Sequence, residues 1–193
     1  MSDDANRPPL PRTEPTGSGL RLRIWTPQDL DPVLRGMNDA AVRRWNASLR
    51  EPLDEAGARA YLRSRAEGWD RGDEAHFCVE DAGTGEALGG VGLHKIDPRR
   101  GTGGIGYWVL PAARGRGVAT RAVELCTRWA FEEAGLYRVQ LDHVVQNEAS
   151  CRVAVRAGYL PEGVARGALP AVEPDGHYDV HVHARLATDP APR

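Results

Sequence analysis

The sequence predicts an α/β domain built on a mixed, mostly antiparallel twisted sheet of about seven strands flanked by about four helices. Three observations lead to this expectation. Gly83-Thr84-Gly85 separates two apolar runs at hairpin spacing. An aromatic and β-branched run at 103–110 passes through a glycine-rich turn into an amphipathic helix. Residues 177–186 alternate polar and apolar side chains, as a half-buried strand does.

Each expected element rests on a local signal. A first strand at 20–26 ends before Pro27, and a helix at 54–67 has Asp54 as its N-cap. A helix at 117–134 carries one apolar stripe and is stopped by Gly135. The remaining expected elements are a helix at 28–37, strands at 75–81, 87–96, 103–110 and 138–145, a helix at 148–157, and strands near 159–166 and 177–186.

Length and composition set the outer limits. The 193 residues suit one domain over 19–187, with a proline-rich extension at 1–18 and a tail at 188–193 expected to be disordered. A net charge of −2, without a basic stripe, argues against nucleic acid as a partner. No apolar run has membrane length and no signal core is present, so we expect a soluble, cytoplasmic protein with no membrane partner.

The most informative stretch is Gly104 to Thr120, where a strand ends on Arg114-Gly115-Arg116-Gly117 at the start of a helix. Unpaired backbone N–H groups and the helix dipole meet there, which makes an anion cradle suited to phosphate. The segment lacks the Lys-Ser/Thr pair of a mononucleotide P-loop. The literal G-x-G-x-x-G at 101–106 enters a strand instead of opening a helix, which excludes a dinucleotide fold.

A third phosphate-binding scheme matches. Arg114-x-Arg116-Gly117-x-Ala119 resembles the R/Q-x-x-G-x-G/A signature of the GNAT superfamily of N-acyltransferases. The run at 105–111, I-G-Y-W-V-L-P, resembles the branch of ribosomal-protein N-terminal acetyltransferases of the RimJ/RimL type. Asn147-Glu148-Ala149-Ser150, the R-A-G-Y at 156–159, Glu162-Gly163 and Tyr178-Asp179 follow in that branch's order. The resemblance covers roughly residues 19 to 187.

This resemblance implies the GNAT fold, with acetyl-CoA as the acyl donor. It implies that the turn holds the pyrophosphate and that the preceding strand holds the pantetheine arm. It also implies that Asn147 contacts the pantetheine and that Ser150 is the acid that protonates the leaving thiolate. Both residues also fit a structural reading, as the N-cap and N3 positions of a helix. The donor-binding residues implied are Trp108, Val109, Leu110, Arg114, Gly115, Arg116, Gly117, Val118, Ala119, Thr120 and Asn147.

The general base is where the chain departs from its branch, which usually has a glutamate at the position of Gly104. Glu80, His94, Asp142 and His143 are substitutes by residue type, and His94 is the best of them because imidazole titrates near neutral pH. Neutralising an α-amine at pH 7 costs about 1.4 kcal/mol, and a lysine about 4.6 kcal/mol. A site without a strong base therefore favours an α-amine acceptor.

A metal site on the last expected strand is not favoured. His177, Asp179, His181 and His183 share one face, but that run spans about 20 Å, too far for one ion to collect both ends. An exposed or cleft-lining polar face is the expectation, on which Asp179 could attract a cationic amine. Cys78, Cys126 and Cys151 lack metal-ligand spacing, and Cys78 and Cys126 suit a reduced core. We expect no metal.

The sequence thus predicts an N-acyltransferase that moves an acetyl group from acetyl-CoA to a primary amine by direct attack, with a peptide N-terminal α-amine as the favoured acceptor. Two alternatives stay open. One is acetylation of a small amine such as an aminoglycoside, polyamine or amino acid. The other is a non-catalytic acyl-CoA sensor, which the missing glutamate permits. The acyl group and the oligomeric state, including a homodimer, are also open.

Overall fold

The computed structural model describes residues 9–46, 49, 51–171 and 176–192. In these residues an eight-stranded sheet has the order β1-β2-β3-β4-β5-β6-β8-β7, and every pair but one is antiparallel. The strands are β1 (Thr16–Gly17), β2 (Leu20–Ile24), β3 (Ala75–Asp81), β4 (Ala87–Asp97), β5 (Thr102–Val109), β6 (Arg138–Val144), β7 (Leu160–Pro170) and β8 (His177–Leu186). The predicted fold class is confirmed.

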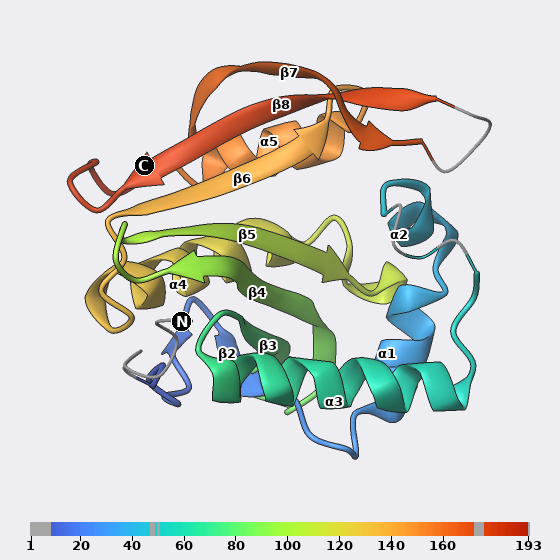
Figure 1. Ribbon diagram of the computed structural model, residues 1–193. Coiled ribbons are helices and arrows are strands. Elements are labelled where there is room, and N and C mark those ends of the chain that lie inside the picture. Colours follow the sequence, from blue (N-terminus) through green and yellow to red (C-terminus); the bar gives the residue numbers. More distant parts are fainter. Residues whose placement is uncertain (1–8, 47–48, 50, 172–175, 193) are drawn as a thin grey trace, which may run out of the picture.

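Helices cover both faces of the sheet (Figure 1). Helices α1 and α3 pack on one face, over β3 and β4, whereas α4 and α5 pack on the other. The helices are α1 (Leu30–Met37), α2 (Ala40–Arg44), α3 (Glu55–Arg71), α4 (Val118–Glu132) and α5 (Glu148–Arg156), with a 3₁₀ turn at Pro111–Ala113. None of these helices combines the length and hydropathy that crossing a membrane requires.

The core has two parts, one on each side of the sheet. The larger part lies under α4, where Trp129 meets Phe77 at a ring-centroid distance of 5.2 Å. The smaller part lies under α1 and α3 and contains Val33, Leu62 and Cys78. Cys78 and Cys126 are buried free thiols, as predicted. Burying these apolar surfaces fixes the sheet between its helices, since each Leu- or Phe-sized side chain contributes about 2 kcal/mol.

Most predicted boundaries are within a few residues of the observed ones, and the structure differs from the expectations in three places. Helix α2 was not predicted, although the side chain of Asp39 caps it. Strand β7 runs to Pro170, past the expected end near residue 166. Residues 1–8 of the extension expected to be disordered lie outside the described residues. Its later part is held in place, because Thr16–Gly17 pairs with β2 and Thr13 accepts a hydrogen bond from Trp129.

Candidate active site

The site begins where β5 and β6 separate. These two strands are parallel and pair only from Thr102 to Gly104 with Arg138 to Gln140. Beyond Gly104, β5 continues along β4, and β6 continues along β8 (Figure 1). The facing edges of β5 and β6 therefore present main-chain groups to the space between them. An extended, amide-containing chain can bind there by adding hydrogen bonds to a strand edge.

The glycine-rich turn lies at the diverging end of β5. Gly115 and Gly117 have φ of +74° and +71°, and nothing lies within 4 Å of a Cβ atom built at either position. Gly117 is the N-cap of α4, and no side chain caps this helix. Val118 is buried, so it offers the site only its backbone N–H. The turn thus leaves the first N–H groups of α4 facing open space, which is the geometry of an anion site.

An ion pair and a hydrogen bond hold the Arg114 side chain of this turn in place. Its guanidinium forms an ion pair with Asp39 and donates a hydrogen bond to the carbonyl oxygen of Val109 at 3.1 Å. Burial raises the pKa of Asp39, but the hydrogen bond from Arg114 and those from α2 outweigh it and hold that pKa below its usual value. Arg114 is consequently paired with a carboxylate in this structure. Arg116 is exposed.

Ser150 lies in the first turn of α5 and is 8% exposed. Its hydroxyl is 2.9 Å from the phenol oxygen of Tyr107, which belongs to the part of β5 beyond the separation from β6. Burial raises the pKa of Tyr107, and the hydrogen bond with Ser150 lowers it in part, so the phenol stays protonated at neutral pH. Asn147 is the N-cap of α5, and its side chain accepts a hydrogen bond from the Ser150 backbone N–H.

The side chain of Trp108 has well-defined packing partners. Its indole packs in the smaller core and stacks on Trp25 at 5.9 Å. Gly36 and Gly90 make room for it, because a Cβ atom at either position would lie within 2.7 Å of the indole. Trp108 and Val109 are the last two residues of β5, and Leu110 follows them. The Trp108 side chain therefore has a packing role.

On the face of the sheet opposite to Tyr107 and Ser150, His94 lies against Gly104, the position at which the sequence departs from its branch. His94 pairs with Gly104 across β4 and β5, and a Cβ atom at Gly104 would lie 2.4 Å from Cε1 of the imidazole. Burial lowers the pKa of His94, and His76 and Lys95 lower it further. The ring is therefore neutral at pH 7 and can accept a proton.

The other three base candidates are placed differently. Glu80 is buried and hydrogen-bonded to Arg23 at 2.9 Å. His143 faces α5, on the opposite side of the sheet from His94, and is hydrogen-bonded within that layer. Asp142 is exposed and accepts hydrogen bonds from Gln140. Among the four, His94 and Asp142 remain near the surface of the acceptor side.

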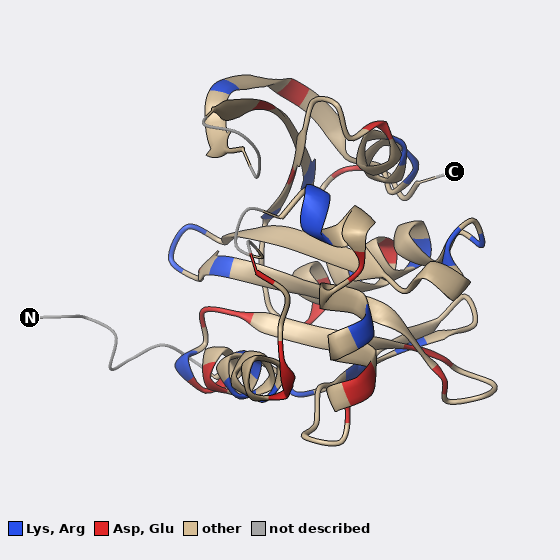
Figure 2. Ribbon diagram, turned by 90° about the vertical axis from the view of Figure 1, so that its right-hand side faces the viewer, with Lys and Arg blue, Asp and Glu red and all other residues tan. Residues whose placement is uncertain are grey.

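The acceptor side is bounded by α1, α2 and α3 on one flank and by β8 on the other. Trp45, at the end of α2, meets Tyr178 of β8 edge-on at 6.4 Å. Asp179 is exposed and accepts a hydrogen bond from the Gly167 backbone N–H, so it is partly engaged within the β7–β8 hairpin. Figure 2, which views the end where β5 and β6 diverge, shows acidic and basic residues interspersed.

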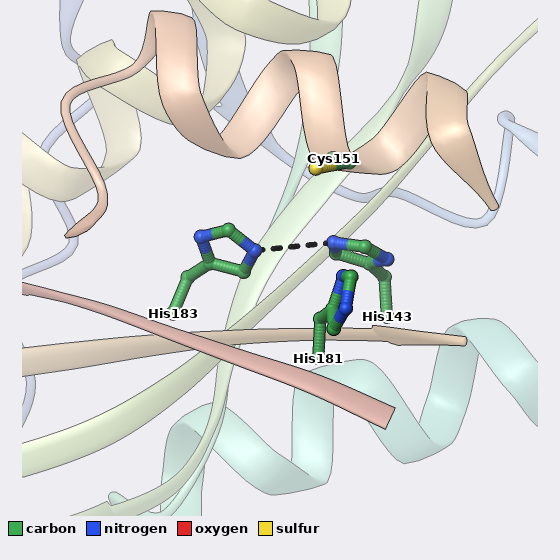
Figure 3. A group of neighbouring side chains, drawn as sticks. All are labelled: His143, Cys151, His181 and His183. Carbon is green, nitrogen blue, oxygen red and sulfur yellow. Dashed lines mark hydrogen bonds between the residues drawn. The ribbon is translucent and has the colours of Figure 1, made fainter. Parts of the chain in front are cut away.

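A histidine cluster under α5 was not predicted. His143, Cys151, His181 and His183 bring one nitrogen or sulfur atom each within 4.8 Å of one another (Figure 3). The expectation was an exposed or cleft-lining polar face, and His183 differs from the exposed alternative because it is only 2% exposed. The sequence argument considered the last strand alone, whereas the cluster joins that strand to a neighbouring strand and a helix. An H-x-H pattern beside a histidine-bearing strand is the signal that could have indicated it.

This geometry is that of a GNAT acyltransferase, and the family comparison agrees. Residues 19–160 match the family described as "Acetyltransferase (GNAT) domain", and the chain belongs to that family. Among curated proteins it is 30% identical over 158 residues to YdaF of Bacillus subtilis strain 168, named as a candidate ribosomal N-acetyltransferase, covering 78% of this chain and 82% of YdaF. It is 29% identical over 101 residues to the ribosomal-protein-serine acetyltransferase of Escherichia coli K12, covering 52% and 55%.

Solved structures show the same fold. RimL, a ribosomal L7/L12 alpha-N-protein acetyltransferase in complex with coenzyme A, matches with a TM-score of 0.80 at 22% identity, covering 89% of this chain and 96% of RimL. The microcin C7 self-immunity acetyltransferase MccE, in complex with acetyl-CoA and AMP, matches with a TM-score of 0.78 at 17% identity, covering 88% and 93%. One fold thus carries proteins with different named roles, and the acceptor must be inferred from the site.

Proposed function

We propose that this chain transfers the acetyl group of acetyl-CoA to the α-amine at the N terminus of a protein or peptide. The observation that carries the proposal is the separation of β5 from β6 beside the Ser150–Tyr107 hydroxyl pair. The turn from Arg114 to Thr120 binds the pyrophosphate. The main chain from Trp108 to Leu110 binds the pantetheine and places the thioester beside Ser150. Asn147 positions the first turn of α5 that carries Ser150.

The two hydroxyl groups suit protonation of the leaving thiolate. The amine attacks the thioester carbonyl carbon, the carbon–sulfur bond breaks, and the sulfur needs a proton. Ser150 donates its hydroxyl proton to the sulfur, the phenol of Tyr107 replaces it across the 2.9 Å contact, and solvent returns a proton to Tyr107. Because burial raises the pKa of Tyr107, that proton is present at neutral pH. Such a positioned acid contributes roughly 10²-fold or more to the rate.

His94 accepts a proton from the acceptor amine. The acceptor ammonium group must lose one proton before it attacks and a second as the amide forms. The neutral imidazole over Gly104 accepts the first proton, and the second passes to solvent. An imidazole with a lowered pKa is a weak base. It is matched to an α-amine, whose deprotonation at pH 7 costs about 1.4 kcal/mol, better than to a lysine at about 4.6 kcal/mol. The names of the ribosomal-protein acetyltransferase relatives point to the same acceptor class.

The test measures release of CoA thiol from acetyl-CoA with a panel of amines. The panel contains peptides that begin with alanine or serine, the same peptides with blocked N termini and an internal lysine, polyamines and aminoglycosides. We expect turnover on the free N-terminal peptides, lowered roughly 10²-fold in Ser150→Ala and less in Tyr107→Phe. Turnover confined to polyamines or aminoglycosides would contradict the α-amine acceptor. Binding of acetyl-CoA without any turnover would contradict catalysis and support a sensor.

A further inference from the structure

The layer between α5 and the last strands holds four metal-ligating side chains that the proposed acyl transfer does not use. His181 and His183 alternate on β8 and so project from the same face. His143 lies directly opposite His181 in the β6–β8 pairing. Cys151 reaches the group from α5, above the sheet (Figure 3). The ring centroid of His143 lies 5.2 Å from that of His181 and 5.2 Å from that of His183.

The hydrogen bonds within the group leave one nitrogen unsatisfied. Nδ1 of His143 is 2.9 Å from the Val144 carbonyl oxygen, so it carries the proton and leaves Nε2 as an acceptor. That Nε2 lies 3.2 Å from Nε2 of His183. If Nε2 of His183 carries the proton, its Nδ1 is a buried acceptor with no hydrogen-bond partner in the described part of the chain. If Nδ1 of His183 carries the proton instead, the Nε2 lone pairs of His143 and His183 face each other.

A cation removes the clash of lone pairs in the second case, because both Nε2 lone pairs then point at the same positive charge while the Nδ1 atoms carry the protons. The backbone carbonyl that fixes the His143 tautomer has the orienting role that second-layer hydrogen bonds have at protein metal sites. From these observations we infer that His143, Cys151, His181 and His183 form a binding site for Zn²⁺.

The distances suit a tetrahedral ion. Zn–N bonds of about 2.0–2.1 Å and a Zn–S bond of about 2.3 Å place neighbouring ligand atoms about 3.3–3.6 Å apart. The two Nε2 atoms are already 3.2 Å apart, and the widest separation in the group is no more than 4.8 Å. Closing that gap requires small side-chain rotations. Three imidazoles and one thiolate favour Zn²⁺ over Mg²⁺ or Ca²⁺, which prefer oxygen ligands.

Binding changes the protonation and the anchoring of the site. The Cys151 sulfur loses its proton to the solvent as the Zn–S bond forms. The ion then links α5 to β6 and β8, three elements that meet here only through packing and hydrogen bonds. Because Ser150 precedes Cys151 in α5, the same link fixes the helix turn that carries the proposed acid.

The experiment uses the untagged full-length chain, stripped with a chelator and titrated with Co²⁺ and then Zn²⁺. We expect one metal per chain, a thiolate-to-cobalt charge-transfer band that Zn²⁺ abolishes, and a Zn²⁺ dissociation constant below about 1 μM. Zn²⁺ should raise Tm by several degrees. Cys151→Ala should abolish the charge-transfer band, and His181→Ala should weaken Zn²⁺ binding by roughly 100-fold. His177→Ala, an exposed histidine on the same strand, is the control and should bind normally.

Several results would overturn the inference. One is a wild-type chain that binds neither ion. Another is a charge-transfer band that persists in Cys151→Ala, since the sulfur would then come from Cys78 or Cys126. A third is equal loss of binding in His177→Ala and His181→Ala. Circular dichroism and acetyl-CoA binding of each variant confirm folding. Metal binding is measured without turnover, so a failure here and a failure of the proposed acetyl transfer are distinguishable.

Discussion

The proposed donor side and the proposed acceptor side of this molecule are built in opposite ways. The donor-side turn is contiguous in sequence, from Arg114 to Thr120, and its chemistry comes from backbone N–H groups at a helix N-terminus. The acceptor side is assembled from β4 and β5, where His94 covers Gly104 because of strand register. A binding site made of backbone can be recognised from a short motif. One made of side chains that meet across strands depends on the whole fold.

The largest expected effect is on the donor side. Gly115→Asp places a negative charge in the turn at a position with φ of +74°, which Asp and Asn tolerate better than most residues. A unit charge about 4 Å from a phosphate oxygen costs about 4 kcal/mol at an effective dielectric constant of about 20. Because the turn is exposed, we expect the acetyl-CoA dissociation constant to rise roughly 100-fold, measured by calorimetry.

Gly115→Asn is the matched control, since it adds the same side-chain shape without the charge. It should weaken acetyl-CoA binding by only a few fold. Equal affinities of the Asp and Asn variants would show that the pyrophosphate does not lie at this turn.

The acceptor side predicts a smaller effect on a different kinetic parameter. His94→Ala should lower kcat roughly 10²-fold and leave the affinity for acetyl-CoA unchanged, because a positioned base contributes about this much. In the double variant His94→Ala/Gly104→Glu the imidazole is gone, so a glutamate fits on Gly104 and should recover part of the rate. No loss in His94→Ala would exclude His94 and leave Asp142 or bulk water.

The pH profile checks the same assignment. Burial, His76 and Lys95 lower the pKa of His94, against smaller opposite effects of Glu74 and Asp142. The base form is therefore lost only as pH falls through a value below 6.5, and kcat/KM should fall with it. His94→Ala should lack this acidic limb. A limb that persists unchanged in the variant would assign it to another group.

The same contrast explains what the sequence could and could not predict. The strand, turn and helix from Thr102 to Glu132 were predicted within about two residues because each signal is local. The contact between Tyr107 and Ser150 could not be predicted, since 43 residues separate them and the packing of α5 on β6, β7 and α4 brings its first turn to Tyr107. The histidine cluster was missed because His143 and His181 meet through the β6–β8 register.

The smallest expected effect tests whether the two sides are independent. Arg114 of the donor turn is paired with Asp39, the N-cap of α2, which flanks the acceptor side. Asp39→Asn keeps the cap, because Asn caps helices as well as Asp does, but it removes the charge that holds the guanidinium. A partly exposed ion pair contributes about 0.2–1 kcal/mol, so we expect acetyl-CoA binding to tighten by a factor between about 1.4 and 5.

This gain should shrink at high ionic strength, since salt screens the pair that the substitution removes. Weaker binding in Asp39→Asn would mean that Asp39 orients Arg114 toward the pyrophosphate instead of competing with it. In that case α2 would couple the two sides directly, because acceptor contacts that shift α2 would also shift a donor-binding side chain. Measuring acetyl-CoA affinity with and without the peptide acceptor, in wild type and Asp39→Asn, distinguishes competition from coupling.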